Sequence, residues 1–183
     1  MSILKVARMG HPVLRAKART VDKSEIKNPT IQQFIDSMID TMYEYSGVGL
    51  AAPQVHESLR VFVAMLDADG RGEGDAIAFI NPEITIIGDQ KVDGWEGCLS
   101  IPEIRGRVPR AQHIKVSAFD RNAKRFELEL KDFPARVVQH ETDHLDGVLV
   151  FDRMKSFETL TYLEEYSRYH TGRSGDDGDE DDE

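Results

Sequence analysis

The stretch His140-Glu141-Thr142-Asp143-His144-Leu145-Asp146-Gly147 decides what the fold must build, because it sets two imidazoles four residues apart with a carboxylate directly after the first. On an α-helix this spacing places both histidines on one face. Two imidazoles side by side can bind one divalent metal ion, and Glu141 can take the proton of a water that the ion activates. The stretch is the H-E-x-x-H arrangement of metal-dependent hydrolases.

The residues around this motif predict the helix that it needs. Val137, Val138 and Leu145 continue an apolar repeat at helical spacing. Pro134 suits the first turn of a helix, and Gly147 suits its C-terminal stop. We therefore expect the two histidines on a helix near the C-terminal end of the fold.

The motif supplies two metal ligands, whereas a catalytic site uses three protein ligands and keeps one position open. Metzincin proteases extend the motif to a third histidine, but this chain matches them only as far as Gly147 and has Val150 at the ligand position. The third ligand must come from elsewhere. The candidates are Cys98, which is the single cysteine, and Glu164 or Glu165 on the following predicted helix.

Length and charge set the domain organisation. A chain of 183 residues is long enough for one domain with a real core, which we expect to cover residues 1–171. The last eight residues are seven acids and one glycine, so their composition predicts a disordered acidic tail over residues 172–183. The net charge of −10 argues against nucleic-acid binding as a main activity.

Cysteine usage and the first residues indicate a compartment. One cysteine excludes an intramolecular disulfide framework and fits a reducing environment. Charges interrupt the apolar residues at the start of the sequence, which does not resemble a signal peptide, and no stretch approaches the ~20 apolar residues of a membrane span. The expected location is the cytoplasm, with no membrane association.

The pattern of apolar residues predicts the remaining elements. Residues 29–45 read as an amphipathic helix, which Asn28 can cap and Gly47 can end. Strands are expected at residues 59–66, 76–80, 83–87, 114–119 and 125–130, the last two as a hairpin, and a final helix at 156–170. With no regular βαβ alternation, the predicted class is α+β, with antiparallel β-sheets packed around the C-terminal H-E-x-x-H helix and an N-terminal amphipathic helix.

Three segments, in this order, resemble the signature motifs of bacterial-type peptide deformylases. They are Gly47-Val-Gly-Leu-Ala-Ala-Pro-Gln54, Glu96-Gly-Cys-Leu-Ser100 and Gln139-His-Glu-Thr-Asp-His-Leu-Asp-Gly147. The flanking runs Met9-Gly-His-Pro-Val-Leu-Arg15 and Ile101-Pro-Glu-Ile-Arg105 look like the same family. The resemblance covers about residues 3–154 and leaves out the acidic tail.

The resemblance implies a role for each matching residue. It makes Cys98, His140 and His144 the metal ligands and thereby favours the cysteine as the third ligand. Glu141 matches the general base and acid. The side-chain amide of Gln54 and the backbone N–H of Leu99 match the donors that stabilise the oxyanion, and Val48, Gly49 and Arg105 match positions that line the substrate groove.

The resemblance also implies an activity. Such an enzyme hydrolyses the N-terminal formyl group of formyl-methionine on newly synthesised polypeptides and releases formate. It implies one divalent metal ion, Fe²⁺ first, although a cysteine and two histidines also suit Zn²⁺, Co²⁺ or Ni²⁺. The expected partners are N-formyl-methionyl nascent peptides, which is compatible with a transient association with the ribosome. The sequence contains no direct nucleic-acid motif.

Two other interpretations use the same motif differently. A small H-E-x-x-H zinc endopeptidase would take His140, His144 and a later glutamate as ligands, and Cys98 would be dispensable. A non-catalytic protein with a structural metal would close the site with a fourth protein ligand. The sequence offers no evident fourth ligand, and Glu141 would then have no function.

Overall fold

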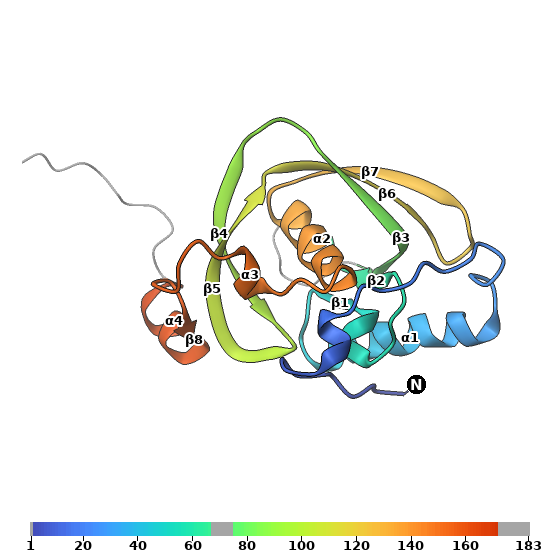
Figure 1. Ribbon diagram of the computed structural model, residues 1–183, viewed down its shortest axis with the longest axis horizontal. Coiled ribbons are helices and arrows are strands. Elements are labelled where there is room, and N and C mark those ends of the chain that lie inside the picture. Colours follow the sequence, from blue (N-terminus) through green and yellow to red (C-terminus); the bar gives the residue numbers. More distant parts are fainter. Residues whose placement is uncertain (1, 67–74, 172–183) are drawn as a thin grey trace, which may run out of the picture.

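The computed structural model describes residues 2–66 and 75–171, so the predicted tail at 172–183 lies outside the described residues. The prediction of an α+β fold with antiparallel sheets is confirmed (Figure 1). The five-stranded sheet has the order β1 (Gly49–Ala51), β2 (Val61–Ala64), β3 (Ile77–Ile86), β6 (His113–Phe119), β7 (Arg125–Lys131). The three-stranded sheet has the order β4 (Lys91–Cys98), β5 (Ile101–Ala111), β8 (Thr161–Tyr162).

Helices fill the space around these sheets. The α-helices are α1 (Pro29–Glu44), α2 (Asp132–Leu145), α3 (Val150–Arg153) and α4 (Leu163–Tyr169), and two short 3-10 helices are η1 (Pro12–Arg15) and η2 (Ala52–Val55). Helix α2 contacts β1, β2, β6 and β7 of the larger sheet and also β5 of the smaller one. It therefore lies between the two sheets, as Figure 1 shows.

The side chains of strand β2 are buried on both faces of the larger sheet. All four of its residues are buried, and successive side chains of a strand point to opposite faces. Val61 and Val63 join the core cluster that contains Met38 of α1, whereas Phe62 joins the cluster that contains Val138 of α2. One helix on each face follows from this pattern.

The two long helices begin and end at residues suited to the purpose. The side-chain oxygen of Asn28 accepts a hydrogen bond from the Thr30 backbone N–H at 2.9 Å, and Pro29 occupies the first turn of α1. Beyond the end of α2, Gly147 has a φ of +73°, a backbone conformation that residues other than glycine rarely adopt. A Cβ atom there would also lie 2.6 Å from the Arg15 carbonyl oxygen, so glycine lets the chain turn sharply after the motif.

Three expected elements differ from the structure. The strands expected at 76–80 and 83–87 form the single strand β3, whose register to β6 shifts between Ile80 and Glu83. Asn81 takes a positive φ of 51° at this irregularity, which lets the strand continue past Pro82. The helix expected at 156–170 is wrong in its first half, because residues Thr161–Tyr162 pair with β5 as β8 and only α4 is helical.

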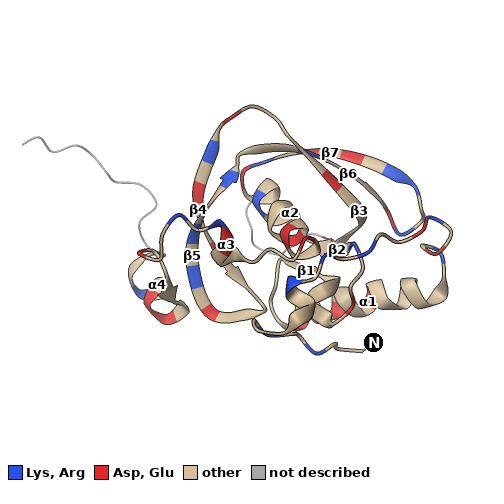
Figure 2. Ribbon diagram, in the orientation of Figure 1, with Lys and Arg blue, Asp and Glu red and all other residues tan. Residues whose placement is uncertain are grey.

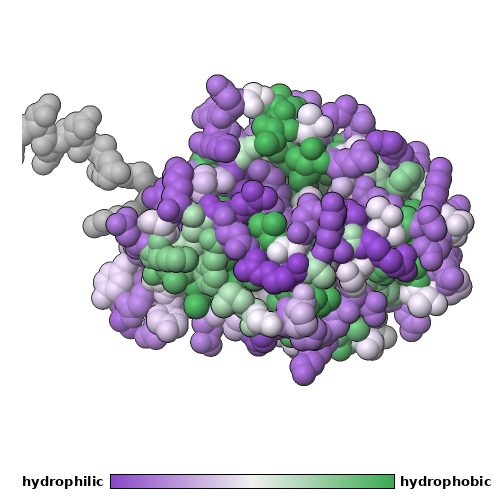
Figure 3. All heavy atoms as spheres, in the orientation of Figure 1, coloured by the Kyte–Doolittle hydropathy of each residue, from purple (hydrophilic) through white to green (hydrophobic). Residues whose placement is uncertain are grey.

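The surface mixes charge and apolar groups. Figure 2 shows acidic and basic residues interspersed along the strands of both sheets. The face in Figure 3 is largely hydrophilic, with apolar atoms at its top over the turn between β3 and β4, where Ile86 is 58% exposed. Within residues 2–66 and 75–171, none of the helices combines the length and the apolar character needed to cross a membrane.

Candidate active site

Helix α2 and the end of strand β4 bring three potential metal ligands together. His140 and His144 lie one turn apart on α2, and Cys98 is the last residue of β4. The Cys98 Sγ lies 3.3 Å from the His144 Nε2. One ligand atom from each of the three buried residues lies within 4.8 Å of the others, which is a spacing that one metal ion can bridge.

The glutamates considered as third ligands lie elsewhere. Glu164 and Glu165 are on α4, where both form ion pairs with Arg168 at 2.9 and 3.1 Å. Among the described residues, the group of potential ligands around the two motif histidines contains Cys98 and no glutamate. The geometry therefore does not favour the ligand set of the endopeptidase interpretation.

Glu141 is buried beside these ligands. Burial raises the pKa of Glu141 to about 7, since a charged carboxylate loses its hydration there. Its Oε2 has no hydrogen-bond partner within the described part of the chain. Strand β1 packs directly against it: a Cβ atom at Gly49 would lie 2.4 Å from the Glu141 Oε1. The carboxylate is thus held in place while one oxygen remains available.

Gln54 is oriented by its own backbone surroundings. Its Oε1 accepts a hydrogen bond from the Ala51 N–H at 2.8 Å, which fixes the side-chain amide in η2. The Nε2 group then faces the Cys98 Sγ at 3.6 Å and the Ser100 Oγ at 3.3 Å. A side-chain N–H donor is therefore fixed next to Cys98, His140 and His144, which we call the ligand cluster. Stabilisation of an oxyanion requires such a fixed donor. Leu99 directly follows Cys98, and its side chain packs over Gly47.

A buried network of charged side chains contacts His140 at its Nδ1 atom. The Nδ1 of His140 is 2.9 Å from a carboxylate oxygen of Glu96, so its Nε2 is left for the ligand cluster. Arg110 makes two hydrogen bonds to the same carboxylate at 2.9 and 3.0 Å, and Arg136 donates a third at 2.8 Å. Burial alone raises the pKa of Glu96, but the hydrogen bonds from His140 and Arg110 bring this pKa well below its usual range.

The network continues to the surface. Arg110 also pairs with Asp143, and Arg153 donates to both oxygens of Asp143 at 3.0 and 2.6 Å. Our reading of the sequence assigned no role to these residues or to Glu96. A signal was present, since Arg136, His140 and Asp143 repeat at helical spacing on one face of α2, where buried charges need partners.

Electrostatics also favour the thiolate form of Cys98. Burial alone raises the pKa of this thiol, but the charge of His144 and hydrogen bonds with His140 and His144 lower it well below its ordinary value. The thiolate, not the thiol, is the metal ligand.

The ligand cluster opens into a groove of about 440 Å³. The residues proposed from the sequence all line it except His144: Val48, Gly49, Gln54, Cys98, Leu99, Arg105, His140 and Glu141. Trp95, Phe133 and Leu163, to which we assigned no role from the sequence, add apolar surface.

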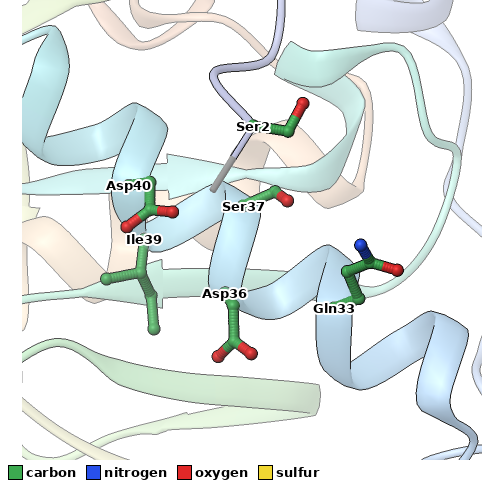
Figure 4. A pocket seen from close by; sticks show the side chains of 6 residues that line it. All are labelled: Ser2, Gln33, Asp36, Ser37, Ile39 and Asp40. Atoms are coloured by element: carbon green, nitrogen blue, oxygen red, sulfur yellow. The ribbon is translucent and has the colours of Figure 1, made fainter.

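A second hollow, of about 390 Å³, lies along α1. Figure 4 shows its lining side chains, which come from α1 and from Ser2 of the N-terminal segment. They include Asp36 and Asp40 but no histidine or cysteine, so this hollow does not reproduce the donor set of the groove.

Known proteins have a similar sequence and fold. The family model of polypeptide deformylases matches residues 3–159. Peptide deformylase 2 of Nostoc sp. is 44% identical over 173 residues, which are 92% of this chain and 96% of that protein. Chloroplastic peptide deformylase 1B of Solanum lycopersicum is 43% identical over 82% of this chain, which spans about half (53%) of that relative.

A solved structure of another peptide deformylase has the same fold as this chain. The Met-Ala-Ser-bound class I type b peptide deformylase of Acinetobacter baumannii superposes with a TM-score of 0.78 at 38% identity, covering 84% of this chain and 99% of the other. Sequence motifs, fold and ligand cluster lead to one conclusion. The chain belongs to the polypeptide deformylase family.

Proposed function

We propose that Cys98, His140 and His144 hold one divalent metal ion and that Glu141 moves the proton in hydrolysis of an N-terminal formyl group. As a member of its family, the chain removes this group from newly synthesised polypeptides. The observation that carries the assignment is the buried cluster of one cysteine sulfur and two imidazoles beside the side chain of Glu141. We also propose that α2, which carries both histidines, is the metal-binding helix.

The residues present fit a metal ion. Sulfur and imidazole nitrogen are suitable donors for Fe²⁺, Zn²⁺, Co²⁺ and Ni²⁺, and all three donors are buried within 4.8 Å of one another. The hydrogen bond between Glu96 and His140 fixes the ring, as expected behind a ligating histidine. A divalent metal ion held there would act as a Lewis acid and would lower the pKa of a bound water toward neutrality. We propose Fe²⁺ as the working ion, as the family resemblance implies.

The chain's own groups then divide the chemistry. Glu141 accepts the proton of the attacking water and then returns it to the departing amine. The Nε2 of Gln54 and the backbone N–H of Leu99 are the proposed donors to the oxyanion, where one fixed donor is typically worth ~10²–10³ in rate. Formate and a free N-terminus are the products.

The groove accounts for the peptide part of the substrate. The relative from Acinetobacter baumannii has been solved with Met-Ala-Ser bound, a peptide that begins with methionine. We propose that the same kind of chain lies in this groove, beside Val48, Gly49 and Arg105. We further propose one catalytic domain over residues 1–171, a cytoplasmic location and a transient association with the ribosome, where such chains emerge.

Substrate choice by the purified protein tests the assignment. The protein is reconstituted without oxygen, with Fe²⁺ and separately with Zn²⁺, and assayed on formyl-Met-Ala, acetyl-Met-Ala and an unblocked longer peptide. We expect formate from the first peptide, with Fe²⁺ faster than Zn²⁺. The acetyl peptide should react roughly 10²-fold more slowly, because its extra methyl group displaces the reacting carbon. Internal cleavage of the longer peptide without formate release would show that the proposal is wrong.

A further inference from the structure

Arg136 joins helix α2 to two strands of the smaller sheet. Its guanidinium donates hydrogen bonds to the carbonyl oxygens of Val92 at 2.6 Å and Gly94 at 3.3 Å, both on β4. It donates another to the carbonyl oxygen of Val108 on β5 at 2.7 Å, besides the bond to the Glu96 carboxylate at 2.8 Å. We call these contacts the Arg136 clamp.

The two strands are shaped to receive this side chain. Gly94 and Val108 are paired residues of β4 and β5, and the carbonyl group of each accepts a bond from Arg136. A Cβ atom at Gly94 would lie 2.7 Å from the Arg136 Cζ, so a side chain there would displace the guanidinium. Arg136 is only 9% exposed, and a buried charge requires such hydrogen-bond partners. The strands therefore form a specific position for this guanidinium.

The elements that the clamp joins are the ones that carry the ligand cluster. On α2, Arg136 lies about one turn before His140 and two turns before His144, on the same face of the helix. On β4, Gly94 lies four residues before Cys98 in the same strand. A contact that fixes α2 against β4 therefore also fixes the imidazoles relative to the cysteine sulfur.

The clamp also reaches the cluster through Glu96. Arg136 bonds to one oxygen of this carboxylate, and the other oxygen lies 2.9 Å from the His140 Nδ1. Arg110 bonds to the same carboxylate and pairs with Asp143, so it connects α2 to β5. Among the described residues, the hydrogen bonds from side chains of α2 to the main chain of β4 come from Arg136. Arg136 thus has a task that Arg110 does not duplicate.

We propose that Arg136 is a positioning residue of the metal site, which holds α2 and β4 at the separation where Cys98, His140 and His144 close on one ion. This inference rests on the proposed function. The task needs the whole guanidinium rather than its charge alone, because contacts on two strands use several N–H groups in one plane. Without the clamp, the ligands are less well held at the ~2.0–2.3 Å that a metal ion requires.

Metal affinity and thiolate ligation test the clamp in the purified, metal-loaded protein. Competition with a chelator gives the Kd for Zn²⁺, and the thiolate-to-metal absorption of the Co²⁺ form reports whether Cys98 is bound. We expect Arg136→Met, which keeps an unbranched side chain, to raise the Kd about 10-fold and to weaken this absorption. Gly94→Ala should do the same, because its methyl group displaces the guanidinium.

Three further variants separate the clamp from charge and from general damage. The double variant of Gly94→Ala with Arg136→Met should raise the Kd no further than either single change, since both remove one contact. Arg136→Lys keeps the charge but has a single ammonium group, so its Kd should stay near that of Arg136→Met. Arg121→Met removes an arginine that bonds to Gln32 and Asp36 of α1, far along the chain, and should keep the wild-type Kd.

The outcomes distinguish the clamp from the metal site itself. Failure of the wild-type protein to bind Zn²⁺ would count against the proposed function. A wild-type Kd in Gly94→Ala or in Arg136→Lys, or an equal rise in Arg121→Met, would overturn the clamp and leave the metal site standing. Because Arg136 also lines the groove, KM for formyl-Met-Ala is measured as well. A change in KM alone, with the Kd for Zn²⁺ unchanged, would overturn the positioning role; if Arg136→Met does not fold, Gly94→Ala decides.

Discussion

Glu141 and His140 are adjacent in the chain, and we propose separate roles for them, proton transfer for Glu141 and metal binding for His140. Glu141→Gln keeps the shape of the side chain and leaves the three ligand residues in place, whereas it removes the proton acceptor. We expect the variant to retain its metal and to lose at least about 10²-fold in kcat, the usual contribution of a general base. Metal analysis alongside kinetics measures both. Unchanged turnover, or a protein without metal, would contradict the role of Glu141.

Cys98 decides which ligand set is correct. Cys98→Ala leaves two histidines, a weak and poorly defined site, so we expect loss of both metal retention and activity. Glu164→Ala and Glu165→Ala are the matched comparisons, because each removes a carboxylate that the structure pairs with Arg168 on α4. Both should keep the metal. Full metal occupancy in Cys98→Ala, with loss in either glutamate variant, would instead support an endopeptidase.

Strand β4 and helix α2 meet through the carboxylate of Glu96. Glu96→Gln removes the charge that faces Arg110 and Arg136 and weakens the support of His140. Groups behind a ligating histidine typically affect metal affinity by 10–100-fold, so we expect the dissociation constant for Zn²⁺ to rise by about that factor. Competition with a chelator measures it. Glu83→Gln, an exposed carboxylate on β3 outside the groove, is the control, and equal affinity in both variants would remove Glu96 from the site.

The sequence predicts elements best where one local pattern determines them. The order of the apolar patterns is enough for the α+β class and the antiparallel sheets. Residues 156–170 keep helical spacing, yet Thr161 and Tyr162 pair with β5 from far away in the chain, and this pairing overrides the local pattern. The network behind His140 shows the same limit, because spacing on α2 reveals buried charges but not that Glu96 and Arg110 supply their partners.

The whole molecule divides into a groove assembled from distant segments and an acidic end. The residues that line the groove range in sequence from Arg8 to Leu163, so segments far apart in the chain form its walls. The sequence of residues 176–183, seven acids and one glycine, has no apolar side chain to add to a core.

Deleting residues 176–183 should therefore leave kcat and KM on formyl-Met-Ala within about twofold of the full chain, since such ends tolerate truncation. The thermal midpoint of unfolding should also stay unchanged, because this segment has no apolar side chain to contribute to a core. Steady-state kinetics at two salt concentrations, with the full chain as control, checks both statements and reveals any long-range effect of the acids on the groove. A large fall in kcat at either salt concentration would show that the tail belongs to the working site.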